Sequence, residues 1–120
     1  MENGVTQLLN MLNKTIYEFD GFGFKFGMYA GHIIEREFKT SVFGLVRRMN
    51  EDGQQTTALL QYFFAGAQAY EDFKKTGKNL TLDEVAEFLE VIGETKAVEI
   101  FNESLALPKN SEAPKETGQS

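Results

Sequence analysis

Few residues of this 120-residue chain have side chains suited to acid–base or nucleophilic chemistry. His32 is the only histidine, and the absence of cysteine excludes thiol catalysis, disulfides and cysteine zinc sites. A lone histidine inside a predicted helix is usually structural, and neither Ser41 nor Ser104 lies in a pattern that would activate its hydroxyl. Neighbouring carboxylates, such as Asp83 and Glu84, diverge on a helix. We therefore expect no enzyme, no cofactor and no catalytic or metal site.

Two glycine-containing segments superficially resemble ligand-binding loops. Gly21-Phe22-Gly23 lacks the GxGxxG spacing and the preceding strand that a phosphate-binding loop requires. The segment 72–83 has the length of a calcium loop, but Lys74 and Lys75 would introduce two positive charges into a cation site. Neither segment predicts a ligand.

The strongest structural signal is the segment 56–73, TTALLQYFFAGAQAYEDF. Its apolar residues recur at three- and four-residue steps, the period of a helix, and the opposite side is small rather than charged. A helix that is apolar around so much of its circumference is normally buried among others. We expect a central helix over 56–73, with Thr56 or Thr57 at its start, lysines in its last turn and Gly77 at the turn that follows.

The first 40 residues are less clear. An apolar helical period predicts a helix over about 5–18, although residues 15–19 could equally form a short strand. Residues 22–26 alternate as a strand would, whereas the period from Phe26 onward is helical. We favour a helix over about 24–38 and leave open a short β segment near 15–26. Gly27 and Gly31 would lie on one face of that helix and allow a close approach.

Capping signals define the remaining helices. Thr40 or Ser41 precedes a short helix over 42–49, and Thr81 with Glu84 forms a capping box before a helix that Gly93 ends. A last helix is expected over about 95–106. The chain is thus predicted to be all-α, a single domain of about five helices over residues 1–107, followed by a disordered tail over 108–120.

Charge is concentrated near one end of the chain. The net charge is −6, and residues 80–107 contain seven acidic residues and one lysine. This composition opposes a polyanionic partner at that end. No apolar run approaches the ~20 residues of a membrane-spanning helix, and the N-terminus lacks the features of a signal peptide. We expect a cytoplasmic protein with no membrane and no nucleic-acid partner.

The segment 80–101 has the spacing of a DNA-reading helix-turn-helix. Its second helix carries Glu94, Glu99 and Glu103 against Lys96, and phosphate contacts need basic residues. These charges do not favour DNA binding, so a small DNA-associated regulator is kept only as an alternative function. A generic acidic helical protein-interaction module is another.

The order of four segments resembles the tail assembly chaperones of long-tailed bacteriophages and prophages. These segments are FGFKFGMYAG, VFGLVRRM, LLQYFFAGAQAY and LTLDEVAEFLE, within a stretch of about 24–105. The resemblance implies a non-enzymatic protein of the bacterial host cytoplasm. It would bind the tape measure protein, keep it soluble until the tail tube assembles, and contact tail tube components. Self-association is also open.

A groove for an amphipathic client helix would need exposed apolar side chains. The candidates are the surplus phenylalanines and the methionines near the glycine pair. The predicted partner-binding residues are Phe22, Phe24, Phe26, Met28, Met49, Phe64 and Phe88.

Overall fold

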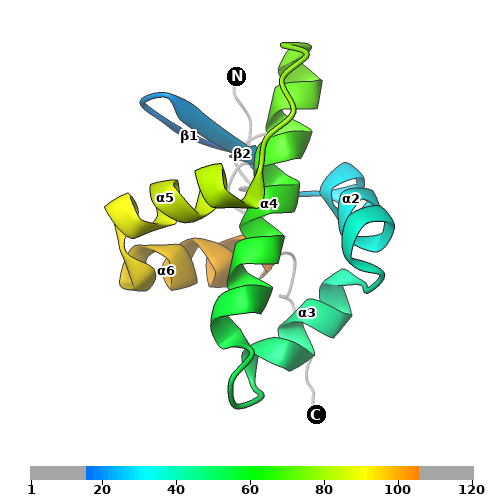
Figure 1. Ribbon diagram of the computed structural model, residues 1–120, viewed down its shortest axis with the longest axis vertical. Coiled ribbons are helices and arrows are strands. Elements are labelled where there is room, and N and C mark those ends of the chain that lie inside the picture. The colour runs from blue at the N-terminus through cyan, green and yellow to red at the C-terminus, as the bar shows by residue number, and fades with distance from the viewer. Residues whose placement is uncertain (1–15, 106–120) are drawn as a thin grey trace, which may run out of the picture.

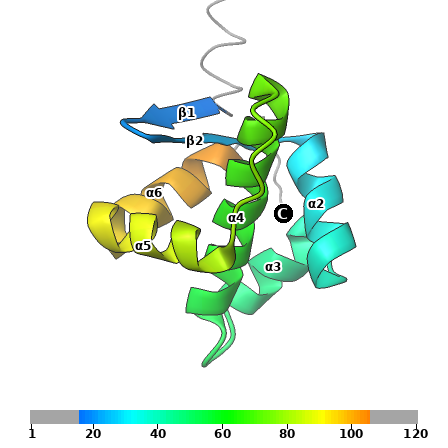
Figure 2. The same cartoon turned by 45° about the horizontal axis from the view of Figure 1, so that its top comes forward.

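A long helix, α4 (Gln55–Lys74), runs through the centre of the computed structural model, which describes residues 16–105 (Figure 1). The remaining elements are β1 (Ile16–Phe19), β2 (Phe22–Lys25), α2 (Met28–Phe38), α3 (Val42–Met49), α5 (Leu82–Ile92) and α6 (Glu94–Leu105). Helix α4 contacts β2 and each of the other four helices. The hairpin, α5 and α6 lie on one side of α4, and α2 and α3 lie on the other (Figures 1 and 2).

The predicted central helix is confirmed, with small differences at its ends. Buried residues occur all around α4, and Phe63 is fully buried. The helix ends at Lys74, one residue beyond the predicted end, where Lys75 adopts the left-handed conformation (φ 59°) and its N–H donates to the carbonyl of Asp72. At its start Gln54, rather than a threonine, is the N-cap. Phe73, expected on the buried face, is half-exposed in the last turn.

A β-hairpin replaces the start of one predicted helix. We expected a helix from Phe24, but residues 22–25 form β2, and α2 begins only at Met28. Strands β1 and β2 are antiparallel, with Tyr17 opposite Phe24, and Gly21 takes a positive φ of 85° in the two-residue turn. The extended chain allows Phe24 and Phe26 to pack edge-on against Phe63 of α4, an arrangement that outweighs the helical period.

The predicted helix over 5–18 is wrong at its end. Residues 16–18 belong to β1, so the strand alternative for this stretch is the correct one. The rest of that helix lies outside the described residues, as do the domain boundary at 107 and the predicted tail. The coarse prediction, a mostly helical fold with a short β segment, is confirmed for residues 16–105.

The capping predictions are also confirmed. The Ser41 hydroxyl accepts from the N–H of Gly44 at the start of α3. In α5 the Thr81 hydroxyl accepts from the N–H of Glu84, and the Glu84 carboxylate accepts from the N–H of Thr81. Gly93 ends α5 at φ 89° and leads directly into α6. Leu82, the first residue of α5, is exposed.

One hydrophobic core joins all of these elements. It contains side chains from the hairpin and from every helix, with Phe24, Ile33, Ile34, Leu45, Phe63 and Val85 fully buried. Between residues 16 and 105, no helix combines the length and apolarity needed to cross a membrane.

Candidate functional site

The residues whose side chains could take part in catalysis or metal binding do not lie close together. His32 is exposed on α2, and Ser41 is occupied in capping α3. Ser104 is buried, where its hydroxyl lies 2.6 Å from that of Tyr62 and donates to the carbonyl of Phe101. Within the described part of the chain, no three His, Cys, Asp or Glu side chains are arranged to hold a metal ion. Ser41 and Ser104 therefore have structural roles, in capping and in core packing respectively.

An apolar surface depression lies between α2 and α3. We call it the α2–α3 groove, an open depression of about 600 Å³. Its lining residues are Gly27, Met28, Gly31, His32, Glu35, Ser41, Val42 and Phe43. The groove therefore includes the glycine pair that the sequence indicated as a place of close approach.

Two large apolar side chains stand beside this groove. Met28 is 94% exposed at the start of α2, and Phe43 is 78% exposed in the first turn of α3. Each contributes little to the core, so neither is explained by packing within residues 16–105. Large apolar side chains exposed together commonly mark a site for another molecule.

Gly27 and Gly31 have no side chains that would fill the groove. A Cβ at Gly27 would contact nothing within 4 Å, and one at Gly31 would lie 3.8 Å from a methyl group of Val42. Below them a smaller cavity of about 150 Å³ shares Gly27, Gly31 and Val42 with the groove. Its inner wall includes Tyr62 of α4 and Leu105 of α6. An apolar side chain entering the groove would therefore meet mostly apolar surface.

Of the seven predicted partner-binding residues, Met28 alone lines this groove. Phe24 and Phe26 are buried in the core, where Phe26 stacks on Tyr62 with ring centroids 4.6 Å apart. We therefore do not retain these two as contact residues in the folded protein. The alternation places Phe24, in β2, and Phe26, just after β2, on the same side, and that side faces α4.

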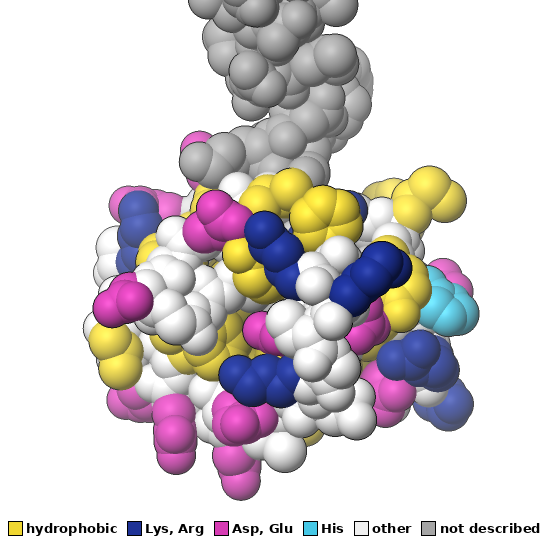
Figure 3. Space-filling view, turned by 90° about the horizontal axis from the view of Figure 1, so that it is seen from above, with side chains coloured by type: hydrophobic (Ala, Val, Ile, Leu, Met, Phe, Trp, Pro, Cys, Tyr) yellow, Lys and Arg dark blue, Asp and Glu magenta, His cyan; other side chains and the backbone are white. Residues whose placement is uncertain are grey.

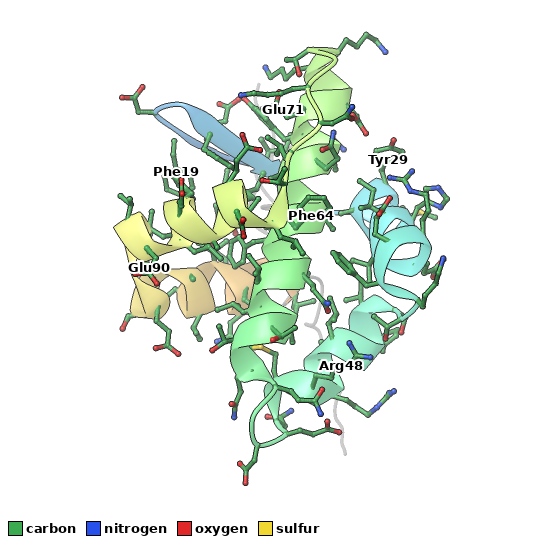
Figure 4. All side chains as sticks on the ribbon, in the orientation of Figure 1. Phe19, Tyr29, Arg48, Phe64, Glu71 and Glu90 are labelled. Carbon is green, nitrogen blue, oxygen red and sulfur yellow. The ribbon has the colours of Figure 1, made fainter. Side chains whose placement is uncertain are left out.

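The other four predicted residues are partly buried and pack against the core. Phe22 of β2 stacks on Phe88 of α5, with ring centroids 4.7 Å apart. Phe64 extends from α4 toward α2 (Figure 4) and meets the ring of Phe38 edge-on at 5.7 Å. Met49 packs at the end of α3. These side chains join helices and the hairpin to one another, and the structure does not bring them together with Met28.

Phe43 was not among the predicted residues. The apolar period of the helix over 42–49 uses Val42, Leu45, Val46 and Met49, which leaves Phe43 on the polar side. The sequence did contain a signal for this exposed residue: the helical period assigns position 43 to solvent, yet the residue there is a phenylalanine.

The acidic residues of the C-terminal part lie on the opposite side of α4 from this groove. They belong to α5 and α6, and acidic side chains gather at the lower left of the molecule in Figure 3, where α5 lies. A single residue, Gly93, connects these helices, whereas a DNA-binding helix-turn-helix has a turn of about three or four residues. Glu94, Glu99 and Glu103 of α6 are exposed, and their charges do not favour a DNA phosphate backbone.

Searches of protein-family models, curated proteins and solved structures gave no match to this chain.

Proposed function

We propose that the chain is a non-enzymatic tail assembly chaperone of a long-tailed bacteriophage or prophage. In the cytoplasm of the bacterial host it would bind the tape measure protein and keep that chain soluble while the tail tube assembles. Two lines of reasoning support the proposal: the resemblance in the order of four sequence segments, and the exposed apolar surface of the α2–α3 groove.

The observation that carries the proposal is the joint exposure of Met28 and Phe43 beside this groove. An amphipathic helix can bury its apolar face in such a groove, with side chains at three- and four-residue steps as anchors. Methionine suits a chaperone because its unbranched, flexible side chain adapts to clients of different shape. His32 and Glu35 provide a polar rim that would remain in contact with water.

The acidic surface of α5 and α6 favours the same role and does not favour the DNA-associated alternative. Because of their net negative charge, copies of a protein, and of the complexes it forms, repel one another and stay in solution. A generic helical interaction module would share the groove but would have no tape measure protein as client.

The test is co-expression with the long helical protein encoded beside this gene. We expect the wild-type chain to move that protein from the pellet to the supernatant after centrifugation and to co-purify with it. The M28S/F43S variant should lose most of this effect. The matched control is F73S/V91S, which removes two other exposed apolar side chains from α4 and α5. Equal loss in both variants, or in neither, would contradict a role for the groove. The absence of any such gene in the locus would contradict the chaperone function itself.

A further inference from the structure

A second groove lies where the start of α4 meets the connection between α5 and α6. We call it the α4–α5–α6 groove; its volume is about 410 Å³. Its apolar lining comes from three helices: Leu59 and Leu60 of α4, Ala86 and Leu89 of α5, and Ala97 of α6. Because alanines and Gly93 line it, the surface is open enough for another helix to approach closely.

Acidic side chains border this apolar surface. Glu90 and Glu94 line the groove, and both are exposed. Figure 4 shows Glu90 on α5, beside the connection to α6. No lysine or arginine of residues 16–105 forms a salt bridge with either carboxylate. Their charge is therefore available to an incoming cation.

The position of Glu90 is not explained by the stability of its own helix. Glu90 lies in the last turn of α5, which contains no basic residue. A carboxylate is unfavourable there, because the C-terminus of a helix carries partial negative charge. Glu94, by contrast, lies in the first turn of α6, where its charge stabilises the helix. The Glu90 carboxylate thus destabilises its own helix locally, and it lies on the rim of an apolar groove.

We infer that the α4–α5–α6 groove binds a basic amphipathic helix of a partner protein. Apolar side chains at three- and four-residue steps would pack between Leu60 and Leu89. Flanking lysines or arginines would lay their apolar stems over the small residues and pair with Glu90 and Glu94. The charge complementarity selects a basic helix over an acidic or neutral one. This surface is separate from the α2–α3 groove and does not depend on the function proposed for that groove.

The probe for this site is a synthetic 15-residue amidated peptide of leucine and lysine, with its leucines on one helical face. The full-length ¹⁵N-labelled chain is titrated with it and followed by NMR. We expect saturable shifts centred on the amides of Leu60, Ala86 and Gly93. A peptide of the same composition with scrambled leucines, and a leucine–glutamate peptide, should bind at least about tenfold more weakly.

Two sets of variants separate the groove from general charge attraction. E90K/E94K should weaken binding at least about tenfold, while D20K/E37K makes the same change in net charge at exposed positions on the hairpin and α2 and should have little effect. A86W should fill the apolar floor and also weaken binding; circular dichroism and thermal melting verify its fold. Equal weakening by both lysine pairs, or shifts spread over the whole acidic surface, would overturn the inference. Unchanged binding by a folded A86W would overturn it too. M28S/F43S should bind the peptide as wild type does.

Discussion

The side-chain amide of Gln68 holds the backbone of Leu80 against the middle of α4. The N–H of Leu80 donates to Oε1 of Gln68 at 2.8 Å, and Nε2 of Gln68 donates to the carbonyl of Lys78 at 2.9 Å. Nε2 also donates to Asp72 at 3.0 Å. Gln68 and Leu80 are both buried, so water cannot replace these bonds. One polar residue of the central helix therefore positions the chain that enters α5 and, through it, the acidic surface.

Replacing Gln68 by leucine should destabilise the fold. The apolar side chain would leave the N–H of Leu80 without its partner, and an unpaired buried group costs about 1–3 kcal/mol. Urea denaturation measures the loss. The matched control is Gln61→Leu on the same helix, because Oε1 of Gln61 is buried with no hydrogen-bond partner within residues 16–105. Q61L should be neutral or slightly stabilising. Similar losses in both variants would contradict the role assigned to Gln68.

Two glycines in helices should respond in opposite ways to alanine. At Gly66 of α4 a Cβ would lie less than 3.0 Å from two carbons of the Phe26 ring, which cannot withdraw because it stacks on Tyr62. G66A should therefore cost about 1–3 kcal/mol despite the better helix propensity of alanine. At Gly31 of α2 the nearest outside atom is 3.8 Å away, so G31A should stabilise by up to about 1 kcal/mol. Thermal melting distinguishes the signs; stabilisation by both would show that Phe26 is free to move.

Folding stability should fall at high pH because of Tyr62. Burial raises the pKa of Tyr62 to about 12, against 10.0 for an ordinary tyrosine. The native state therefore keeps this proton longer than the unfolded chain does. Stability should be unaffected by Tyr62 below pH 10 and should fall by about 2 kcal/mol by pH 12. Urea denaturation at stepped pH values measures this decline.

The Y62F variant provides the control for that decline. Its loss at neutral pH should be about 1 kcal/mol, since Ser104 keeps its bond to the carbonyl of Phe101. Its stability should fall less steeply between pH 10 and 12. Some decline should remain, because burial and the Glu103 carboxylate also raise the pKa of Tyr17. A variant whose decline matches that of the wild type would contradict the assignment.

The sequence was sufficient to predict the elements in which the local pattern of residues and the tertiary packing favour the same structure. The apolar period of α4 and the caps at Ser41 and Thr81 predicted three helices closely. At Phe24 the two preferences conflict. The helical period there is favourable locally, but only an extended chain packs Phe24 and Phe26 against Phe63, a contact far along the chain that periodicity cannot reveal.

The candidate surfaces were predictable only in part. Gly27 and Gly31 were predicted to share one helix face, and Met28 was predicted to bind a partner. The structure places all three in one groove with Phe43 of the next helix. Phe22 and Phe88 were interpreted as surface aromatics, although they pack on each other across 66 residues of sequence. Residue type gives the amount of apolar surface, whereas the angle between helices decides which part of it is left exposed.

The hairpin should depend on Phe88 for its order. The ring of Phe88 lies 4.7 Å from that of Phe22, 5.2 Å from that of Phe19 and 5.6 Å from that of Phe24. An isolated two-stranded hairpin is at best marginally stable in water, so its contacts with α4 and with Phe88 of α5 must supply much of its stability. F88A should cost somewhat less than the about 3–5 kcal/mol of a fully buried phenylalanine. Hydrogen exchange should accelerate most at the amides of β1 and β2, and little in α3. The control is F73A, which removes a half-exposed ring and should leave the hairpin amides protected. Uniform acceleration throughout the chain in F88A would mean that Phe88 stabilises the whole fold rather than the hairpin in particular.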